Sequence, residues 1–202
     1  MEPFREAVWR SVPPGAEPER FAARSRFMLG HVEPGWRVLD LGCGDGRFSA
    51  LLRDHGARPT GIDVAHAAVR RARAAQPWLD ARQADEGEPL PADEDSFDAV
   101  WAGEVLEHVV DTVGMVAEVR RVLRFGGPLL VTTPYHGRVA TAVLALRGCA
   151  FAEHFDPRAD HLRFFTEASL RGLLNDGGFP SVSATATGGP PLLRRALHVC
   201  AS

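Results

Sequence analysis

Three glycines at alternate positions follow a short aliphatic run in the first quarter of the chain. The run is Val38–Leu41, and Gly42, Gly44 and Gly46 follow it, just ahead of residues with helical spacing. A glycine loop between a strand and a helix lets a ligand press against bare backbone N–H groups at the helix N-terminus. The loop therefore predicts a binding site for a nucleoside-containing ligand.

The spacing of these glycines separates the loop from a dinucleotide-binding fingerprint. That fingerprint is G-x-G-x-x-G, with an acidic residue about 20 positions later. Here the pattern is G-x-G-x-G, and Asp40 stands two residues before the first glycine. An acidic residue is still available as Asp63, at the end of the next predicted strand, 59–64. The spacing disfavours a nicotinamide-dependent oxidoreductase.

Acidic residues lie at or just after the ends of four predicted strands, at Asp40, Asp63, Asp85 and Glu104. In an open parallel sheet, ligands bind beyond the carboxyl ends of the strands. One sheet edge should therefore gather four acids, and such a cleft suits a cationic ligand better than a pyrophosphate.

A second chemical group follows the fourth predicted strand. Glu104, Glu107 and His108 are spaced i, i+3 and i+4, so on a helix they would share one face. His108 could act as a general base, or it could be a structural cap. The three residues could also form an oxygen-and-nitrogen metal site with His161 as a further ligand, although we do not favour a metal here.

The elements that must position these residues alternate along the chain. Strands are expected at 37–41, 59–64, 81–84, 97–102, 128–133, 182–187 and 197–201, with helices at 4–10, 18–30, 67–76, 111–123 and 166–176 and one after the glycine loop. Alternation of this kind predicts a mostly parallel sheet with helices on both faces. We expect one domain over 1–202, an N-terminal helical segment at 1–33, and an insertion at 135–165 that covers the acceptor side as a lid.

Composition narrows the possible partners. The net charge of −3 gives no basic field for nucleic acid, so we expect no DNA and disfavour RNA. Three widely spaced cysteines without a C-x-x-C pair suit a reducing cytoplasm. No run approaches the roughly 20 apolar residues of a membrane span. The chain should be a cytoplasmic monomer or homodimer.

The D-x-G-x-G-x-G pattern with the acid after the second strand resembles the class I S-adenosylmethionine-dependent methyltransferases. Within that class the chain is similar to the ubiquinone- and menaquinone-biosynthesis type of small-molecule methyltransferase. The closer match lies in Leu90-Pro91, 96–98, 104–109, 121–127 and Gly178-Phe179. This resemblance implies a Rossmann-like, doubly wound α/β fold with a mostly parallel seven-stranded sheet. One departure is Phe125-Gly126-Gly127-Pro128, where the family commonly has proline before the glycines and an apolar residue after them.

The resemblance also implies how the methionine part of the cofactor is held. Gly42 and Gly44 would let that part approach the backbone, and Asp40 would orient its ammonium end. The backbone of 102–104, ending at Glu104, would close this side of the site.

The nucleoside part would meet three other acids. By the same resemblance, Asp63 would accept both ribose hydroxyls and Asp85 the adenine amine, with the backbone of Glu86 at the ring edge. The cofactor is then S-adenosyl-L-methionine, and the product is S-adenosyl-L-homocysteine.

The favoured function is methyl transfer to a small-molecule acceptor, with oxygen as the favoured atom. His108 and Tyr135 are the candidate catalytic residues, and Tyr135 could equally be structural. The segment 135–160 offers an apolar wall with a few cationic groups, which suits an amphipathic or anionic small molecule. The E-x-x-E-H string also resembles small-RNA 2′-O-methyltransferases, which keeps a metal-dependent RNA enzyme as an alternative. A cofactor-binding module without turnover is a further alternative.

Overall fold

A seven-stranded sheet forms the centre of the computed structural model, which describes residues 4–13, 15–147, 153–154, 156, 161–190 and 194–202. The strands are β1 (Arg37–Leu41), β2 (Arg58–Asp63), β3 (Asp80–Gln83), β4 (Ala99–Gly103), β5 (Leu129–Pro134), β6 (Val182–Thr187) and β7 (Ala196–Ala201). Their order is β3-β2-β1-β4-β5-β7-β6, and β7 runs antiparallel to both of its neighbours.

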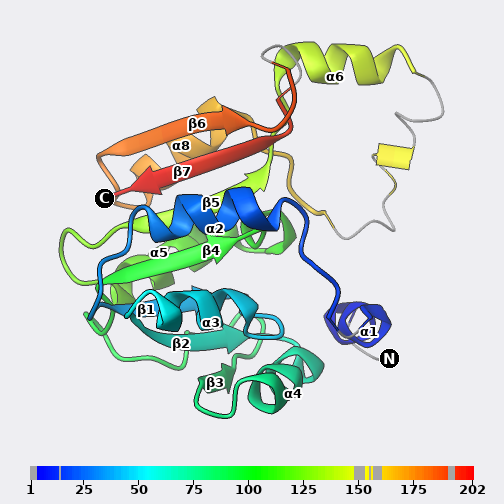
Figure 1. Cartoon of the computed structure of the whole chain (residues 1–202). Helices are drawn as coiled ribbons and strands as arrows, with labels where there is room; N and C mark the ends of the chain where they lie inside the picture. Colours follow the sequence, from blue (N-terminus) through cyan, green and yellow to red (C-terminus); the bar gives the residue numbers. More distant parts are fainter. Residues whose placement is uncertain (1–3, 14, 148–152, 155, 157–160, 191–193) are drawn as a thin grey trace.

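Helices cover both faces of this sheet (Figure 1). One face carries α2 (Phe21–Leu29), α3 (Arg47–Asp54) and α4 (His66–Ala75), and the other carries α5 (Thr112–Val122) and α8 (Glu167–Asp176). Helix α1 (Phe4–Ser11) and helix α6 (Arg138–Ala145) lie outside these two layers, and the 3-10 turn η1 (Leu106–His108) follows β4.

The central strands are apolar because both of their faces are buried. In β4, Val100 and Ala102 pack into the core on the α5 side, while Trp101 packs among Met28 and Phe48 on the α2 and α3 side. Burial of this kind fixes the register, since a shift by one residue would exchange the two faces of each strand. The carboxyl ends of β1, β2 and β4 are thereby held at one edge.

The sheet reverses its winding between β1 and β4. From β1 the chain moves outward through β2 to β3, and then returns to place β4 on the other side of β1. Ligands bind at such a reversal, beyond the carboxyl ends of the strands. Leu41 at the end of β1 pairs with Ile62 of β2 and Ala102 of β4, so the loops that follow these strands begin side by side.

The predicted doubly wound fold is confirmed. The bounds of β1 and β6 are as predicted, and the other strands differ by one or two residues at their ends. Within the predicted insertion at 135–165 the structure describes α6, whereas residues 148–152, 155 and 157–160 lie outside the described residues. Among the helices of the described segments, none has the length and apolar character needed to span a membrane.

Candidate cofactor and acceptor site

The glycine loop has a backbone conformation and close contacts that exclude residues with a side chain. Gly42 and Gly44 have φ values of 69° and 57°, in the left-handed region that favours glycine. A Cβ on Gly42 would lie 2.6 Å from the Val105 side chain, and a Cβ on Gly44 would lie 2.6 Å from the Trp9 ring. The loop therefore presents bare backbone ahead of α3, as the glycine spacing predicts.

Asp63 connects this loop to the end of β2. One carboxylate oxygen accepts the N–H of Gly44 at 3.0 Å, and the other accepts the N–H of Ala65 at 2.9 Å. Burial raises the pKa of Asp63, while the two backbone donors lower it. Each oxygen keeps a lone pair, so the carboxylate can still accept hydroxyl groups. The predicted contact of Asp63 with the ribose is compatible with this geometry and remains a prediction.

Asp40 is buried beneath the glycine loop. Its side chain is buried, and one carboxylate oxygen accepts the hydroxyl of Ser49 on α3 at 2.6 Å. Burial raises the pKa of Asp40 to about 7, and the charge of Asp63 acts in the same direction. Asp40 thus links β1 to α3 beneath the glycine loop. Its predicted role toward an ammonium group stays a prediction.

The remaining predicted cofactor acids lie on neighbouring loops. Asp85 and Glu86 are exposed just after β3, whose last residue, Gln83, pairs with Asp63. Glu104 follows β4 with a φ of 57°, an uncommon value for a residue with a side chain. Its N–H donates to the carbonyl of Thr132, which fixes this strained position next to β5.

The expected helical face over Glu104, Glu107 and His108 is wrong in one respect. Only Leu106–His108 forms a single 3-10 turn, η1, and Glu104 stands before it in the left-handed conformation. Glu104 therefore does not continue the turn that carries the other two. The charge of Glu104 nevertheless adds to the effect of burial in raising the pKa of Glu107.

Arg24 is a buried cation beside these acids that the sequence analysis missed. It is 6% exposed, and its guanidinium carbon lies 4.7 Å from the Phe48 ring centroid and 5.9 Å from that of Trp101. Burial lowers the pKa of Arg24, and the charge of Glu104 is the largest opposing influence. The Nε atom of Arg24 has no hydrogen-bond partner in the described part of the chain.

A signal for Arg24 was available in the sequence. Phe21, Arg24 and Met28 are spaced i, i+3 and i+7, so the arginine stands in the apolar stripe of its helix. A charge in such a stripe is rarely buried without a partner. That combination marks Arg24 as a candidate for binding an anionic group.

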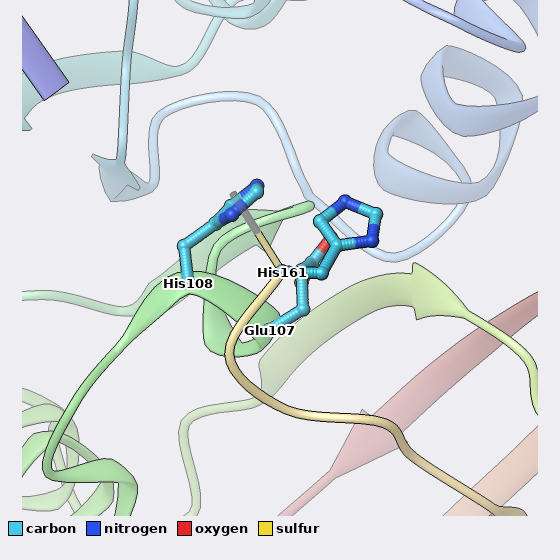
Figure 2. A group of neighbouring side chains, drawn as sticks. All are labelled: Glu107, His108 and His161. Atoms are coloured by element: carbon cyan, nitrogen blue, oxygen red, sulfur yellow. The ribbon is translucent and has the colours of Figure 1, made fainter. Parts of the chain in front are cut away.

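Glu107, His108 and His161 form a compact group beyond the carboxyl end of β4 (Figure 2). One ligand atom from each lies within 4.8 Å of the others, and the two imidazole ring centroids are 5.0 Å apart. Figure 2 shows Glu107 and His108 on one turn and His161 on a separate segment. The carbonyl of Glu107 accepts the N–H groups of Leu162 and Arg163 at 2.8 and 3.0 Å, which ties that segment to η1.

The Glu107 carboxyl is buried with only one of its two oxygens hydrogen-bonded within the described residues. Its Oε2 atom accepts the hydroxyl of Thr133 at 3.1 Å, and its Oε1 atom has no hydrogen-bond partner among the described residues. Burial raises the pKa of Glu107 to about 8, and the charge of Glu104 adds to this effect. A buried carboxyl with one unpartnered oxygen can serve a metal ion or a polar group of a ligand.

Two chemical roles fit this group, and they exclude each other at His108. One carboxylate and two imidazoles are a ligand set that binds zinc or iron with positions left open. A histidine that coordinates a metal through its free nitrogen cannot also accept a proton there. His108 is therefore either a general base or a ligand.

Tyr135 lies apart from this group. It lines a cavity of about 530 Å³ with seven other residues: His136, Gly137, Arg138, Thr166, Glu167, Ala168 and Arg171. None of the predicted cofactor residues lines this cavity, and neither does His108. Tyr135 and His108 therefore do not both line this cavity, and a catalytic role for Tyr135 remains a prediction.

The chain is similar to known methyltransferases. Residues 39–131 match the family model described as a methyltransferase domain. The chain is 34% identical over 179 residues to a protein of Mycolicibacterium smegmatis named as an S-adenosylmethionine-dependent methyltransferase, covering 84% of this chain and 63% of that protein. It is also 34% identical over 163 residues to a ubiquinone biosynthesis O-methyltransferase of Xanthomonas axonopodis pv. citri, covering 77% of this chain and 67% of the relative.

Solved structures share the fold. An S-adenosylmethionine-dependent methyltransferase from Mesorhizobium loti superposes with a TM-score of 0.70 at 23% identity, over 93% of this chain and 98% of that one. A methyltransferase in complex with the Haloferax volcanii Trm112 activator gives a TM-score of 0.71 at 22% identity, over 100% and 98%. The chain spans about three fifths to two thirds of the length of the two curated relatives named above. It belongs to the class I S-adenosylmethionine-dependent methyltransferases.

Proposed function

We propose that this chain transfers the methyl group of S-adenosylmethionine to an oxygen atom of a small molecule. The observation that carries the proposal is the arrangement at one sheet edge. The glycine loop follows β1, Asp63 is the last residue of β2, and Glu107 and His108 follow β4. The name of the Xanthomonas relative supports oxygen as the accepting atom.

The bound cofactor would supply an electrophilic methyl group on a sulfonium. The protein's part is to align the acceptor, exclude water and accept its proton. Asp63, Asp85 and the backbone of Glu86 would hold the nucleoside part. Gly42 and Gly44 would receive the methionine part, with the guanidinium of Arg24 available for its carboxylate.

His108 would accept the proton of the acceptor hydroxyl. It stands on η1 next to Glu107, whose raised pKa keeps that carboxyl largely protonated at neutral pH. The imidazole, rather than this protonated carboxyl, would then be the group that accepts the proton.

The test uses the full chain and S-adenosylmethionine labelled in its methyl group. The acceptors are hydroxylated aromatic molecules, RNA with a free terminal ribose, and amines of similar size. Label in the hydroxylated small molecules supports the proposal, and label in RNA alone favours the alternative 2′-O-methyltransferase. Binding of S-adenosylhomocysteine with no transfer to any acceptor would instead favour a module without turnover.

Replacing His108 tests its role within that assay. We expect His108→Ala to lower kcat about 100-fold or more, the usual contribution of a general base. His31→Ala is the matched control, because His31 is exposed and bonds only to the carbonyl of Phe27. Equal turnover in the two variants would contradict a catalytic His108.

A metal-dependent form of the same reaction is the second candidate. The observation that favours it is the clustering of Glu107, His108 and His161 within 4.8 Å. A metal there would hold the acceptor oxygen and lower its pKa, so that no protein base is needed.

Chelation separates the two candidates. If the metal is required, activity vanishes after treatment with a chelator and returns with a divalent ion, and His161→Ala no longer retains the ion by elemental analysis. Full activity after chelation rejects the metal and leaves His108 as the base.

The free thiols Cys43 and Cys200 in the described residues support the further proposal of a cytoplasmic location.

A further inference from the structure

Helix α1 lies over the loops that carry the proposed cofactor residues. The Nη2 group of Arg5 donates to the carbonyl of His108 at 3.2 Å, on the turn that follows β4. The Oε2 atom of Glu6 accepts the N–H of Ala67 at 3.0 Å, in the first turn of α4 after β2. These contacts tie one short helix to the loops after two different strands.

Trp9 of the same helix covers the loop after β1. A Cβ on Gly44 would lie 2.6 Å from the Trp9 ring, so the indole lies directly against the backbone of the glycine loop. The guanidinium carbon of Arg71 lies 5.9 Å from the centre of this ring, and an Nη1 hydrogen bond of 2.7 Å joins Arg71 to the carbonyl of Val12. The indole is thereby held between α4 and the glycine loop.

Arg5 also faces the proposed ribose acid. Its positive charge lowers the pKa of Asp63, against the larger effect of burial. A single side chain of α1 is thus near Asp63 on the cofactor side and bonded to His108 on the acceptor side.

No residue of α1 belongs to the hydrophobic core clusters of the described residues. Figure 1 shows this helix beside the N-terminus, at the edge of the molecule next to α4. The side chains of Arg5, Glu6, Val8 and Trp9 are only partly buried. Segments with few buried apolar contacts open at a small fraction of the global unfolding free energy.

We propose that α1 is the roof of the cofactor site, with Trp9 and Arg5 as cofactor-binding residues, and that it opens to admit the cofactor and release its product. This inference rests on the proposed function, because it requires that S-adenosylmethionine binds at the glycine loop. A ligand that lies on Gly44 must meet the indole that already covers this residue. Bound ligand should therefore hold α1 closed.

Tryptophan fluorescence of the full chain tests the contact. The chain has four tryptophans, and only Trp9 touches the glycine loop through a contact that the structure describes. Titration with S-adenosylhomocysteine should change the emission of the unaltered protein. Trp9→Phe should lose most of this change while calorimetry still detects binding. The control is Trp36→Phe, since Trp36 precedes β1 at the opposite edge of the sheet and should keep the signal.

Affinity and proteolysis supply independent readouts. Trp9→Ala should weaken S-adenosylhomocysteine binding roughly tenfold by calorimetry, the scale of a lost aromatic contact. The ligand should slow tryptic cleavage after Arg10, an exposed residue of α1, several-fold in the unaltered protein and less in Arg5→Ala.

The outcomes separate this inference from the proposed function. If the unaltered protein does not bind S-adenosylhomocysteine, both are overturned. If it binds, but Trp9→Phe keeps the fluorescence change and Trp9→Ala keeps the affinity, then only the roof is overturned. Protection of the Arg10 site together with a weaker Trp9→Ala variant supports it.

Discussion

Individual residues of the proposed cofactor site also hold its loops together. Asp63 illustrates this, because its two oxygens already accept the N–H groups of Gly44 and Ala65. The glycine spacing and the acid after the second strand predict Gly42, Gly44 and Asp63 as cofactor residues, and the structure brings Gly44 and Asp63 into contact. Arg24 and Trp9 could not be placed from that pattern, because both reach the site from helices that precede β1 and their contacts are set by packing.

Asp63→Ala should weaken binding of S-adenosylmethionine by about 1–3 kcal/mol, the scale of losing hydrogen bonds to a charged acceptor. Isothermal calorimetry measures the change. Asp54→Ala is the control, since Asp54 is an exposed acid at the end of α3. An unchanged affinity in Asp63→Ala would remove Asp63 from the site.

Asp40 predicts a pH dependence of stability. Its pKa is raised to about 7, above its ordinary value of 3.8, by burial. Between these values the folded protein holds a proton that the unfolded chain has lost, so this group makes stability fall as the pH rises through that window. Asp40→Asn abolishes this contribution and keeps an acceptor for Ser49.

Thermal unfolding of the ligand-free protein measures that effect. The melting temperature of Asp40→Asn relative to the unaltered protein should be higher at pH 8 than at pH 5. A difference that is the same at both pH values would mean that Asp40 is ionised throughout. Asp54→Asn, at an exposed position, should show no such trend.

At the scale of the elements, local sequence predicted the strands better than the turn that carries the chemistry. Runs such as 37–41 and 182–187 are bounded by turn residues, so their ends are marked. The spacing of Glu104 and His108 suggested a helix, but the left-handed backbone at Glu104 interrupts it. The approach of His161 to Glu107 depends on backbone bonds from Leu162 and Arg163 to Glu107, 55 and 56 positions apart, which no local pattern contains.

The position of η1 also depends on how the next helix begins. The Asp111 side chain accepts the N–H of Gly114 at 2.9 Å and so caps α5, which follows η1. Asp111→Ala should lower the free energy of unfolding by about 0.5–2 kcal/mol, as the loss of an N-cap does. Urea unfolding measures this. Asp176→Ala, at the last residue of α8, should change the free energy of unfolding much less. If Asp111→Ala leaves the free energy of unfolding unchanged, α5 does not need the cap.

At the scale of the whole molecule, the sheet order explains why one edge can gather residues from distant parts of the sequence. The reversal between β1 and β4 brings the loops after three strands together, and α1 crosses them. The sequence predicted seven strands and a doubly wound sheet, whereas it predicted neither the position of β7 between β5 and β6 nor the position of α1.

A ligand that binds the folded chain and not the unfolded chain should raise the free energy of unfolding. S-adenosylhomocysteine at about 100 times its Kd should raise the free energy of unfolding by about 2.7 kcal/mol. Differential scanning calorimetry should then record a higher melting temperature. A nicotinamide dinucleotide at the same concentration should leave it unchanged, and stabilisation by the dinucleotide instead would revive the oxidoreductase hypothesis.

The antiparallel strand β7 has a consequence for synthesis on the ribosome. β5, which leads to Tyr135, is paired on one side by β4 and on the other by residues 196–201. Until these late residues leave the exit tunnel, one side of β5 is an open edge, and open edges invite pairing with other chains. The nascent protein is therefore exposed to aggregation along β5 until translation has passed β7.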